Sequence, residues 1–329
     1  MNYPKSYVSE AQQIIDDRKN KNGYMLDLRY EEIKSKLPLA KKYIEDMAET
    51  INKVAQLIVA RDERIREKIA VIEKENLDIQ KALEEELIKN GYPADYLNPI
   101  YTCEICCDTG RDGSKRCECF NSVLKQLAGK KLSEQMPVGL MSFDTFDMRY
   151  YSDVPRTELK GKSAKFIMQQ NFDYCRSYAE NFHLPCDGIF MMGGTGLGKT
   201  HLSLSIAREV SDKGFSVVYG SVPDLIRKIK DESFGQSDEE GEVLETIKEC
   251  DLLVLDDLGA EHDTKYNTSN LYEIINSRIN NRRPTIVSTN FSISEIRERY
   301  SDRIASRLLS MKCMVFSGDD IRMALKQNK

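Results

Sequence analysis

Hydrophobic positions in the first third of the chain recur at a helical spacing. Residues 1–38 are polar and predict one or two helices that end near Pro38. From Lys41 to about Asn90 there is no glycine or proline, and apolar side chains follow a three-four alternation that is broken at Arg61. This stripe predicts a long amphipathic helix or helix pair, whose seam would pack either on a partner protein or within its own domain. Its members are Ile44, Met47, Ile51, Val54, Ile58 and Ile65.

The pattern changes from residue 162 onward, where short apolar runs alternate with helical segments. Helices are predicted over 163–182 and 201–210 in this region, and over 120–132 before it. An alternation of strands and helices is typical of an α/β fold with a parallel sheet covered by helices. The strands are expected at 188–192, 215–219, 251–256, 284–289 and 313–317.

A complete phosphate-binding loop stands between the first of these strands and the helix that follows it. The sequence is Gly193-Gly194-Thr195-Gly196-Leu197-Gly198-Lys199-Thr200, which matches G-x-x-x-x-G-K-[ST]. Glycines let the backbone N–H groups turn inward around a phosphate. Lys199 is expected to reach the β- and γ-phosphates, and the Thr200 hydroxyl to ligate Mg²⁺. We therefore predict that the chain binds a nucleoside triphosphate.

Two later strands end in polar side chains that would complete this site. Asp256 and Asp257 follow an apolar strand, and Asn290 follows another. Since parallel strands present their carboxyl ends at one edge, we expect Asn290 to lie beside Asp256. Asp256 is predicted to hold Mg²⁺ through water, and Asp257 to orient or deprotonate the attacking water. The alternatives are an acidic turn after a buried strand and an asparagine that caps the next helix, although Ser292 is the better cap.

Arginines near the end of the chain are candidates for a finger that enters a neighbouring subunit. Arg303 and Arg307 are four residues apart and share one helix face. Either could offset transition-state charge, or the pair could belong to a solvated basic helix. Arg322 could approach the phosphates. A further group, Arg278, Arg282 and Arg283, is expected to form a solvated helix face and not a DNA contact.

Five of the nine cysteines fall between residues 103 and 119. Cys103-x-x-Cys106 and Cys117-x-Cys119 could supply four thiolates to a tetrahedral structural zinc ion. Cys107 could replace Cys106. The alternatives to a zinc site in this cysteine-rich segment are a redox pair and an iron–sulfur cluster. A loop this short has little core, so a bound metal would supply much of its folding energy.

Composition limits the remaining possibilities. The 329 residues carry a net charge of −5, so the chain as a whole is not a polybasic nucleic-acid binder. No membrane span and no signal peptide are expected, and a cytoplasmic location is predicted. We divide the chain into a helical partner-binding domain (1–100), a zinc module (101–120), a linker (121–160) and an ATPase domain (161–329). The linker holds an aromatic patch, which would pack on the ATPase core or flank an adenine: Phe143, Phe146, Tyr150 and Tyr151.

Together these motifs resemble the DnaC/DnaI/IstB group of AAA+ ATPases. The resemblance covers residues 140–329 and rests on the phosphate loop, the paired aspartates, Ser288-Thr289-Asn290 and Arg303-x-x-x-Arg307. The cysteine cluster and the helical N-terminus are similar to those of DnaI-type helicase loaders. About a dozen residues follow the last strand, so a P-loop AAA+ core without a helical lid is expected.

The resemblance implies an ATPase that binds the hexameric replicative DNA helicase and helps to place it on single-stranded DNA. It implies ATP, Mg²⁺ and Zn²⁺ as cofactors and an ATP-dependent homo-oligomer. It gives Asn290 the sensor 1 role and Arg307 the finger role, with Arg303 as the other candidate. Asp257 stands where many AAA+ proteins have glutamate, which suggests slow hydrolysis. The alternatives are an IstB-like transposition helper and a nucleotide-switched interaction protein.

Overall fold

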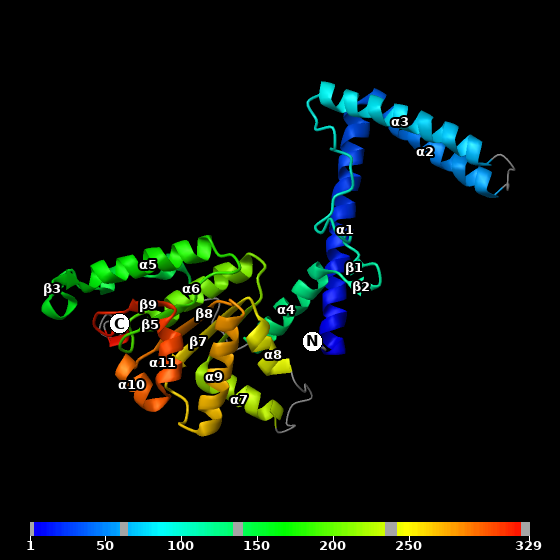
Figure 1. Cartoon of the computed structure of the whole chain (residues 1–329). Coiled ribbons are helices and arrows are strands. Elements are labelled where there is room, and N and C mark those ends of the chain that lie inside the picture. Colours follow the sequence, from blue (N-terminus) through cyan, green and yellow to red (C-terminus); the bar gives the residue numbers. More distant parts are fainter. Residues whose placement is uncertain (1–2, 60–64, 134–140, 234–241, 324–329) are drawn as a thin grey trace. The chain divides into compact units, whose positions relative to one another are not determined.

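The computed structural model describes residues 3–59, 65–133, 141–233 and 242–323 (Figure 1). The chain forms two compact units. One contains residues 12–117, and the other contains residues 1–11 together with residues 118–329. Helix α1 (Lys5–Lys36) begins in the second of these units and continues into the first. None of the described helices has both the length and the apolar character that a bilayer span requires.

The unit of residues 12–117 is helical, and its predicted helix pair is confirmed. Helix α2 (Pro38–Val59) packs along α3 (Ile65–Lys89). Proline at the first position of α2 removes an N–H that would have no helical partner. A small core joins these helices to the segment after α3, and it contains Ile33, Ala40, Leu83, Leu87 and Leu97. The predicted apolar stripe is not buried throughout, since Ile51 is 65% exposed; the side chains of Ile58 and Ile65 lie outside the described residues.

A parallel sheet of five strands forms the centre of the other unit, in the order β6-β7-β8-β5-β9. All five strands were predicted from their apolar runs, and the α/β fold class is confirmed. Residues 316–323, which the structure describes beyond the last strand, do not themselves form a lid domain. The strands are β5 (Ile189–Met192), β6 (Val217–Ser221), β7 (Leu252–Leu258), β8 (Thr285–Thr289) and β9 (Lys312–Val315).

Helices cover both faces of the sheet (Figure 1). Successive side chains of β7 point to opposite faces, so Leu252 and Val254 join one core while Leu253 and Leu255 join the other. Helices α5 (Ala164–Glu180) and α6 (Lys199–Asp212) pack on the first face. The second face is covered by α7 (Val222–Ser233), α8 (Glu242–Glu249), α9 (Lys265–Asn280), α10 (Ile293–Arg299) and α11 (Asp302–Leu309).

Smaller elements frame this core. Helix α4 (Glu118–Leu132) packs against β6 and α8. Two-residue strands make the pairs β1 (Arg111–Asp112) with β2 (Lys115–Arg116) and β3 (Pro155–Arg156) with β4 (Lys162–Ser163). Short 3-10 turns lie at Phe143–Thr145, Met148–Tyr150 and Thr157–Leu159.

Candidate nucleotide and metal sites

The phosphate loop leads from β5 directly into the N-terminus of α6. Gly198 precedes the helix with a φ of 89°, in the left-handed region that glycine favours. A side chain there would also collide with its neighbours, since a Cβ atom would stand 2.7 Å from the Tyr151 hydroxyl oxygen. That hydroxyl donates to the Leu197 carbonyl at 3.0 Å. Backbone freedom and close packing therefore both require glycine at this position.

Lys199 is buried at the centre of the site. Its ammonium group donates to the carbonyl oxygens of Gly193 and Gly194, at 2.7 Å each, and to Asn290 Oδ1 at 2.8 Å. Burial lowers the pKa of Lys199, and the nearby carboxylates of Asp257 and Asp256 oppose that shift. The Lys199 side chain thus folds back onto the carbonyl groups of its own loop, and it points toward the ends of β5 and β8.

Three hydroxyl groups hold the Asp256 carboxylate. Thr200 donates to it at 3.0 Å, Tyr219 donates at 2.8 Å, and Ser288 donates to its other oxygen. Burial raises the pKa of Tyr219, and Asp256 adds to that rise, so the phenol remains a donor. Ligands of an octahedral Mg²⁺ at about 2.1 Å lie roughly 3.0 Å apart. The oxygens of Thr200 and Asp256 are therefore close enough together to hold one such ion.

Asp257 points away from the sheet into the site, unlike Asp256. Its φ is 62°, and the register of β7 against β8 shifts between Leu255 and Leu258. This bulge turns Asp257 outward, where its Oδ1 accepts from Asn290 Nδ2 at 3.0 Å. The backbone N–H of Asp257 donates to Ser288 Oγ at 3.0 Å. Asn290 was expected beside Asp256, but its amide contacts Asp257 and Lys199.

A cavity of about 480 Å³ opens over these groups. The phosphate loop from Thr195 to Thr200 lines it, together with Asp257, Asn290 and Arg322. Part of the predicted aromatic patch also lines it, with Phe146, Tyr150 and Tyr151. Phe143 and Tyr151 are also buried in the core beneath, so the patch both packs on the ATPase core and faces the cavity.

His201 fastens the aromatic segment to the phosphate loop. Its Nε2 lies 2.9 Å from the Ser142 carbonyl oxygen and 3.1 Å from Thr145 Oγ1. Because a carbonyl oxygen only accepts, Nε2 carries the proton. The Phe146 ring meets the imidazole edge-on, with centroids 5.1 Å apart. His201, which directly follows Thr200 of the phosphate loop, thus positions one wall of the cavity.

The candidate finger arginines do not line this cavity. Arg303 is exposed and Arg307 half-buried on α11. Arg322, in contrast, lies at the cavity wall. Its segment crosses the phosphate loop, because Ile321 N–H donates to the Gly196 carbonyl at 3.1 Å. The structure therefore brings together the loop, the paired aspartates, Asn290 and Arg322, and leaves Arg303 and Arg307 outside the same site.

The expectation that Arg278 belongs to a solvated face is wrong. Its side chain is fully buried. The guanidinium donates to Thr285 Oγ1 at 2.9 Å and to several carbonyls, of Ile247, Lys248, Cys250 and Pro284. Two of those carbonyls belong to the last turn of α8, where a cation stabilises the helix dipole. Arg282 is exposed as expected.

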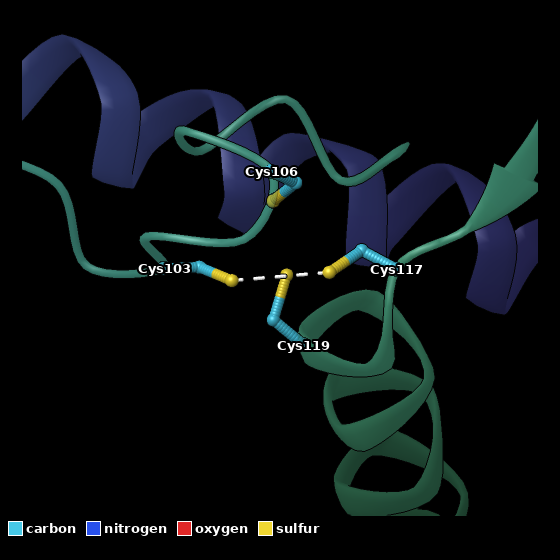
Figure 2. Close-up of side chains that lie close together, drawn as sticks. All are labelled: Cys103, Cys106, Cys117 and Cys119. Atoms are coloured by element: carbon cyan, nitrogen blue, oxygen red, sulfur yellow. Dashed lines mark hydrogen bonds between the residues drawn. The ribbon is translucent and has the colours of Figure 1, made fainter. Parts of the chain in front are cut away.

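Four of the clustered cysteines lie together, and Figure 2 shows their side chains pointing toward one another. The Sγ atoms of Cys103, Cys106, Cys117 and Cys119 all lie within 4.8 Å of one another. The Sγ atoms of Cys103 and Cys117 are 3.8 Å apart. Two sulfur ligands of a tetrahedral zinc ion, with bonds of roughly 2.3 Å, are separated by about the same distance. The four thiols therefore fit zinc.

Cys107 lies outside this group. Its φ is 50°, and its exposed thiol faces the Glu104 carbonyl instead. The turn is held by Asp108, which accepts from the backbone N–H groups of Thr102 and Cys103 at 2.9 and 2.8 Å. Of the two adjacent cysteines, Cys106 is the one that the turn directs inward.

Comparisons with known proteins agree with this site. Residues 178–316 match the family model for IstB-like ATP binding proteins. The chain is 29% identical over 133 residues to the replicative helicase loader DnaC of Escherichia coli (strain K12), covering 40% of this chain and 54% of the relative. It is 29% identical over 147 residues to the replicative helicase loader DnaI of Bacillus subtilis (strain 168), covering 44% and 46%. A crystal structure of the DnaC helicase loader aligns with a TM-score of 0.46 at 23% identity, covering 55% of this chain and 99% of that one.

The unit around the parallel sheet is thus a P-loop domain of AAA+ type. More narrowly, residues 178–316 form an ATP-binding domain of the IstB/DnaC family, which the phosphate loop and strand ends indicated. The chain spans about half the length of the curated relatives that it matches.

Two residues that hold the Asp256 carboxylate were not assigned this role from the sequence. Tyr219 lies near the end of β6, and Ser288 near the end of β8. Both lie toward the carboxyl ends of strands that flank β7, where residues can reach a shared ligand. The same reasoning that selected Asn290 could have selected them, since β6 and β8 both pair with β7.

Proposed function

We propose that this chain is an ATPase that loads the replicative DNA helicase onto single-stranded DNA. The loader part rests on the similarity of its ATPase domain to DnaC and DnaI, together with a separate helical unit that could hold a partner. The enzymatic part rests on one observation, the hydrogen-bonded chain from Lys199 through Asn290 to Asp257. We expect the protein to act in the cytoplasm.

In this proposal the phosphate loop binds the triphosphate, with Lys199 transferring its hydrogen bonds from the loop carbonyls to phosphate oxygens. Thr200 would bind Mg²⁺ directly and Asp256 would hold it through water, and the ion would neutralise charge on the phosphates. Tyr219 and Ser288 orient the Asp256 carboxylate for that purpose. Phe146 and Tyr150, which line the cavity, offer aromatic surface to the base.

Asp257 orients or deprotonates the attacking water, and Asn290 holds Asp257 in place. Because aspartate is shorter than glutamate, we expect hydrolysis to be slow. Arg307 or Arg303 acts as a finger in the site of a neighbouring copy, so hydrolysis should depend on ATP-dependent self-association. Zinc held by Cys103, Cys106, Cys117 and Cys119 would stabilise the turn that carries these cysteines.

A transposition helper of the IstB type shares the ATPase core and is the second candidate. The match of residues 178–316 to IstB-like proteins favours it. A nucleotide-switched interaction protein is the third, and the assembled hydrolytic residues argue against it.

A pull-down from native cell extract would separate these functions. The full chain is the bait, with ATP and Mg²⁺ present, and bound proteins are identified by mass spectrometry. Recovery of the hexameric replicative helicase supports the loader. Recovery of a transposase supports the transposition helper instead. Recovery of neither protein favours the nucleotide-switched interaction protein.

A further inference from the structure

A buried carboxylate lies just beyond the paired aspartates, outside the nucleotide cavity. Glu261 is 5% exposed and belongs to the loop between β7 and α9. A buried charge is costly unless hydrogen bonds compensate it. The partners of Glu261 come from two different parts of the domain, which gives the side chain a role that an apolar residue could not fill.

One side of this carboxylate holds the turn that follows Asp257. The Gly259 N–H donates to Glu261 Oε2 at 3.1 Å, and the Ala260 N–H donates to the Asp257 carbonyl at 3.1 Å. Gly259 adopts a φ of 111°, and a Cβ atom there would collide with the Phe291 ring. Phe291 directly follows Asn290. The turn is therefore fastened next to both residues that would handle the attacking water.

The other side holds the junction between α10 and α11. The Tyr300 hydroxyl donates to Glu261 Oε1, and the Arg299 guanidinium donates to the Glu261 carbonyl. Arg299 also lies over the rings of Phe291 and Tyr300, 5.4 and 5.7 Å from their centroids. Tyr300 is 7% exposed and ends α10. Ser301, the next residue, precedes α11, which carries Arg303 and Arg307.

We propose that Glu261 is a positioning residue that couples the Asp257 turn to the helix carrying the candidate finger arginines. Through Tyr300 and Gly259, the placement of α11 and the placement of the hydrolytic carboxylate depend on one buried side chain. When α11 of one copy places a finger arginine in the site of a neighbouring copy, that contact would therefore also affect the position of Asp257 in the first copy. This proposal rests on the proposed function, since it requires the chain to hydrolyse ATP.

Four variants of the full chain test the coupling. Glu261→Ala removes both side-chain hydrogen bonds and Tyr300→Phe removes one. Glu261→Gln can still accept from Gly259 with its oxygen and donate to the Tyr300 hydroxyl with its amide, so it should rescue. Glu298→Ala is the matched control, because Glu298 is an exposed carboxylate on α10.

The measurements are nucleotide affinity, from a fluorescent ATP analogue, and single-turnover hydrolysis per bound nucleotide. We expect Glu261→Ala and Tyr300→Phe to slow hydrolysis about 10- to 100-fold, as misplacement of a reacting group does, while affinity changes less than about twofold. Glu261→Gln and Glu298→Ala should hydrolyse ATP at close to the wild-type rate. Unchanged hydrolysis in Glu261→Ala, or an equal loss of affinity and rate, would overturn the proposal.

A double-mutant cycle distinguishes positioning from a general loss of stability. In a background with both Arg303→Ala and Arg307→Ala, the Tyr300→Phe change should have no further effect on the hydrolysis rate. If the effects multiply instead, Tyr300 does not act through α11 and the coupling is refuted. A wild-type chain that hydrolyses no ATP would overturn the proposed function itself, which is a result distinct from either.

Discussion

Asn290 accepts a hydrogen bond from Lys199 at 2.8 Å, although 91 residues separate them in the sequence. The same amide donates to Asp257 at 3.0 Å. One side chain thus joins the phosphate-binding lysine to the carboxylate proposed to direct water. A substitution of Asn290 can therefore test hydrolysis separately from nucleotide binding.

Replacing Asn290 with alanine should slow ATP hydrolysis about 10- to 100-fold, because Asp257 would lose the group that orients it. Nucleotide affinity should change little, since Lys199 keeps its loop partners. Single-turnover hydrolysis and equilibrium binding measure the two effects separately. Asn281→Ala is the control, an exposed asparagine just after α9. A large loss of affinity in Asn290→Ala would mean that the residue serves binding.

Asp257→Asn should lower the hydrolysis rate by roughly 100- to 10,000-fold, the usual contribution of a general base. The carboxamide occupies the same space, so the bulge and the ATP affinity should be retained. Asp256→Asn should differ, since it weakens the magnesium ligand and makes hydrolysis require more Mg²⁺. A titration of hydrolysis rate against Mg²⁺ concentration for both variants checks this distinction. If both respond alike to Mg²⁺, the division of roles between the two aspartates is wrong.

Zinc removal should destabilise the cysteine segment. Cys106→Ser is expected to lower bound zinc, measured by elemental analysis, and to lower the melting temperature. Cys107→Ser should leave both unchanged, because its thiol points away from the other four. The two cysteines are sequence neighbours, so each variant controls for the other. Equal zinc loss in both, or zinc loss in neither, would contradict the four-ligand site.

Arg278→Met should lower the free energy of unfolding by about 1–3 kcal/mol or more, since it leaves several buried carbonyls without a donor. Urea denaturation measures the change. Arg282→Met is the control at an exposed position nearby and should shift stability by less than about 0.5 kcal/mol. A small effect of Arg278→Met would show that those carbonyls find other partners.

Acid should weaken the contact between α1 and the segment after α3. Glu32 accepts hydrogen bonds from Lys36, Tyr96 and Tyr92, in that order of effect, and they lower its pKa from 4.5 to about 2. A folded-state pKa below the unfolded value stabilises the fold above about pH 4.5, and that contribution is lost as the pH falls toward about 2. Glu32→Gln should therefore lower the melting temperature at about pH 6 and match the wild type near pH 2. An equal difference at both pH values would contradict this assignment.

The sheet and the phosphate loop could be predicted because their signals are local. Each strand contains a short apolar run, and the phosphate loop is contiguous in sequence. Arg278 could not be recognised, since its partners are backbone carbonyls that only the fold brings near. Glu261 and Tyr300 were missed for the same reason. Cys106 and Cys107 could not be separated, because the choice depends on a left-handed turn at Cys107 and Asp108.

A helicase-loading assay on circular single-stranded DNA tests the proposed loader function most directly. The replicative helicase is mixed with the DNA and ATP, with the wild-type chain, with Lys199→Ala or with no loader, and helicase on DNA is measured after gel filtration. We expect the wild-type chain to increase loading and Lys199→Ala to leave it at the level without loader. Equal loading in all three reactions would contradict the proposed loader function.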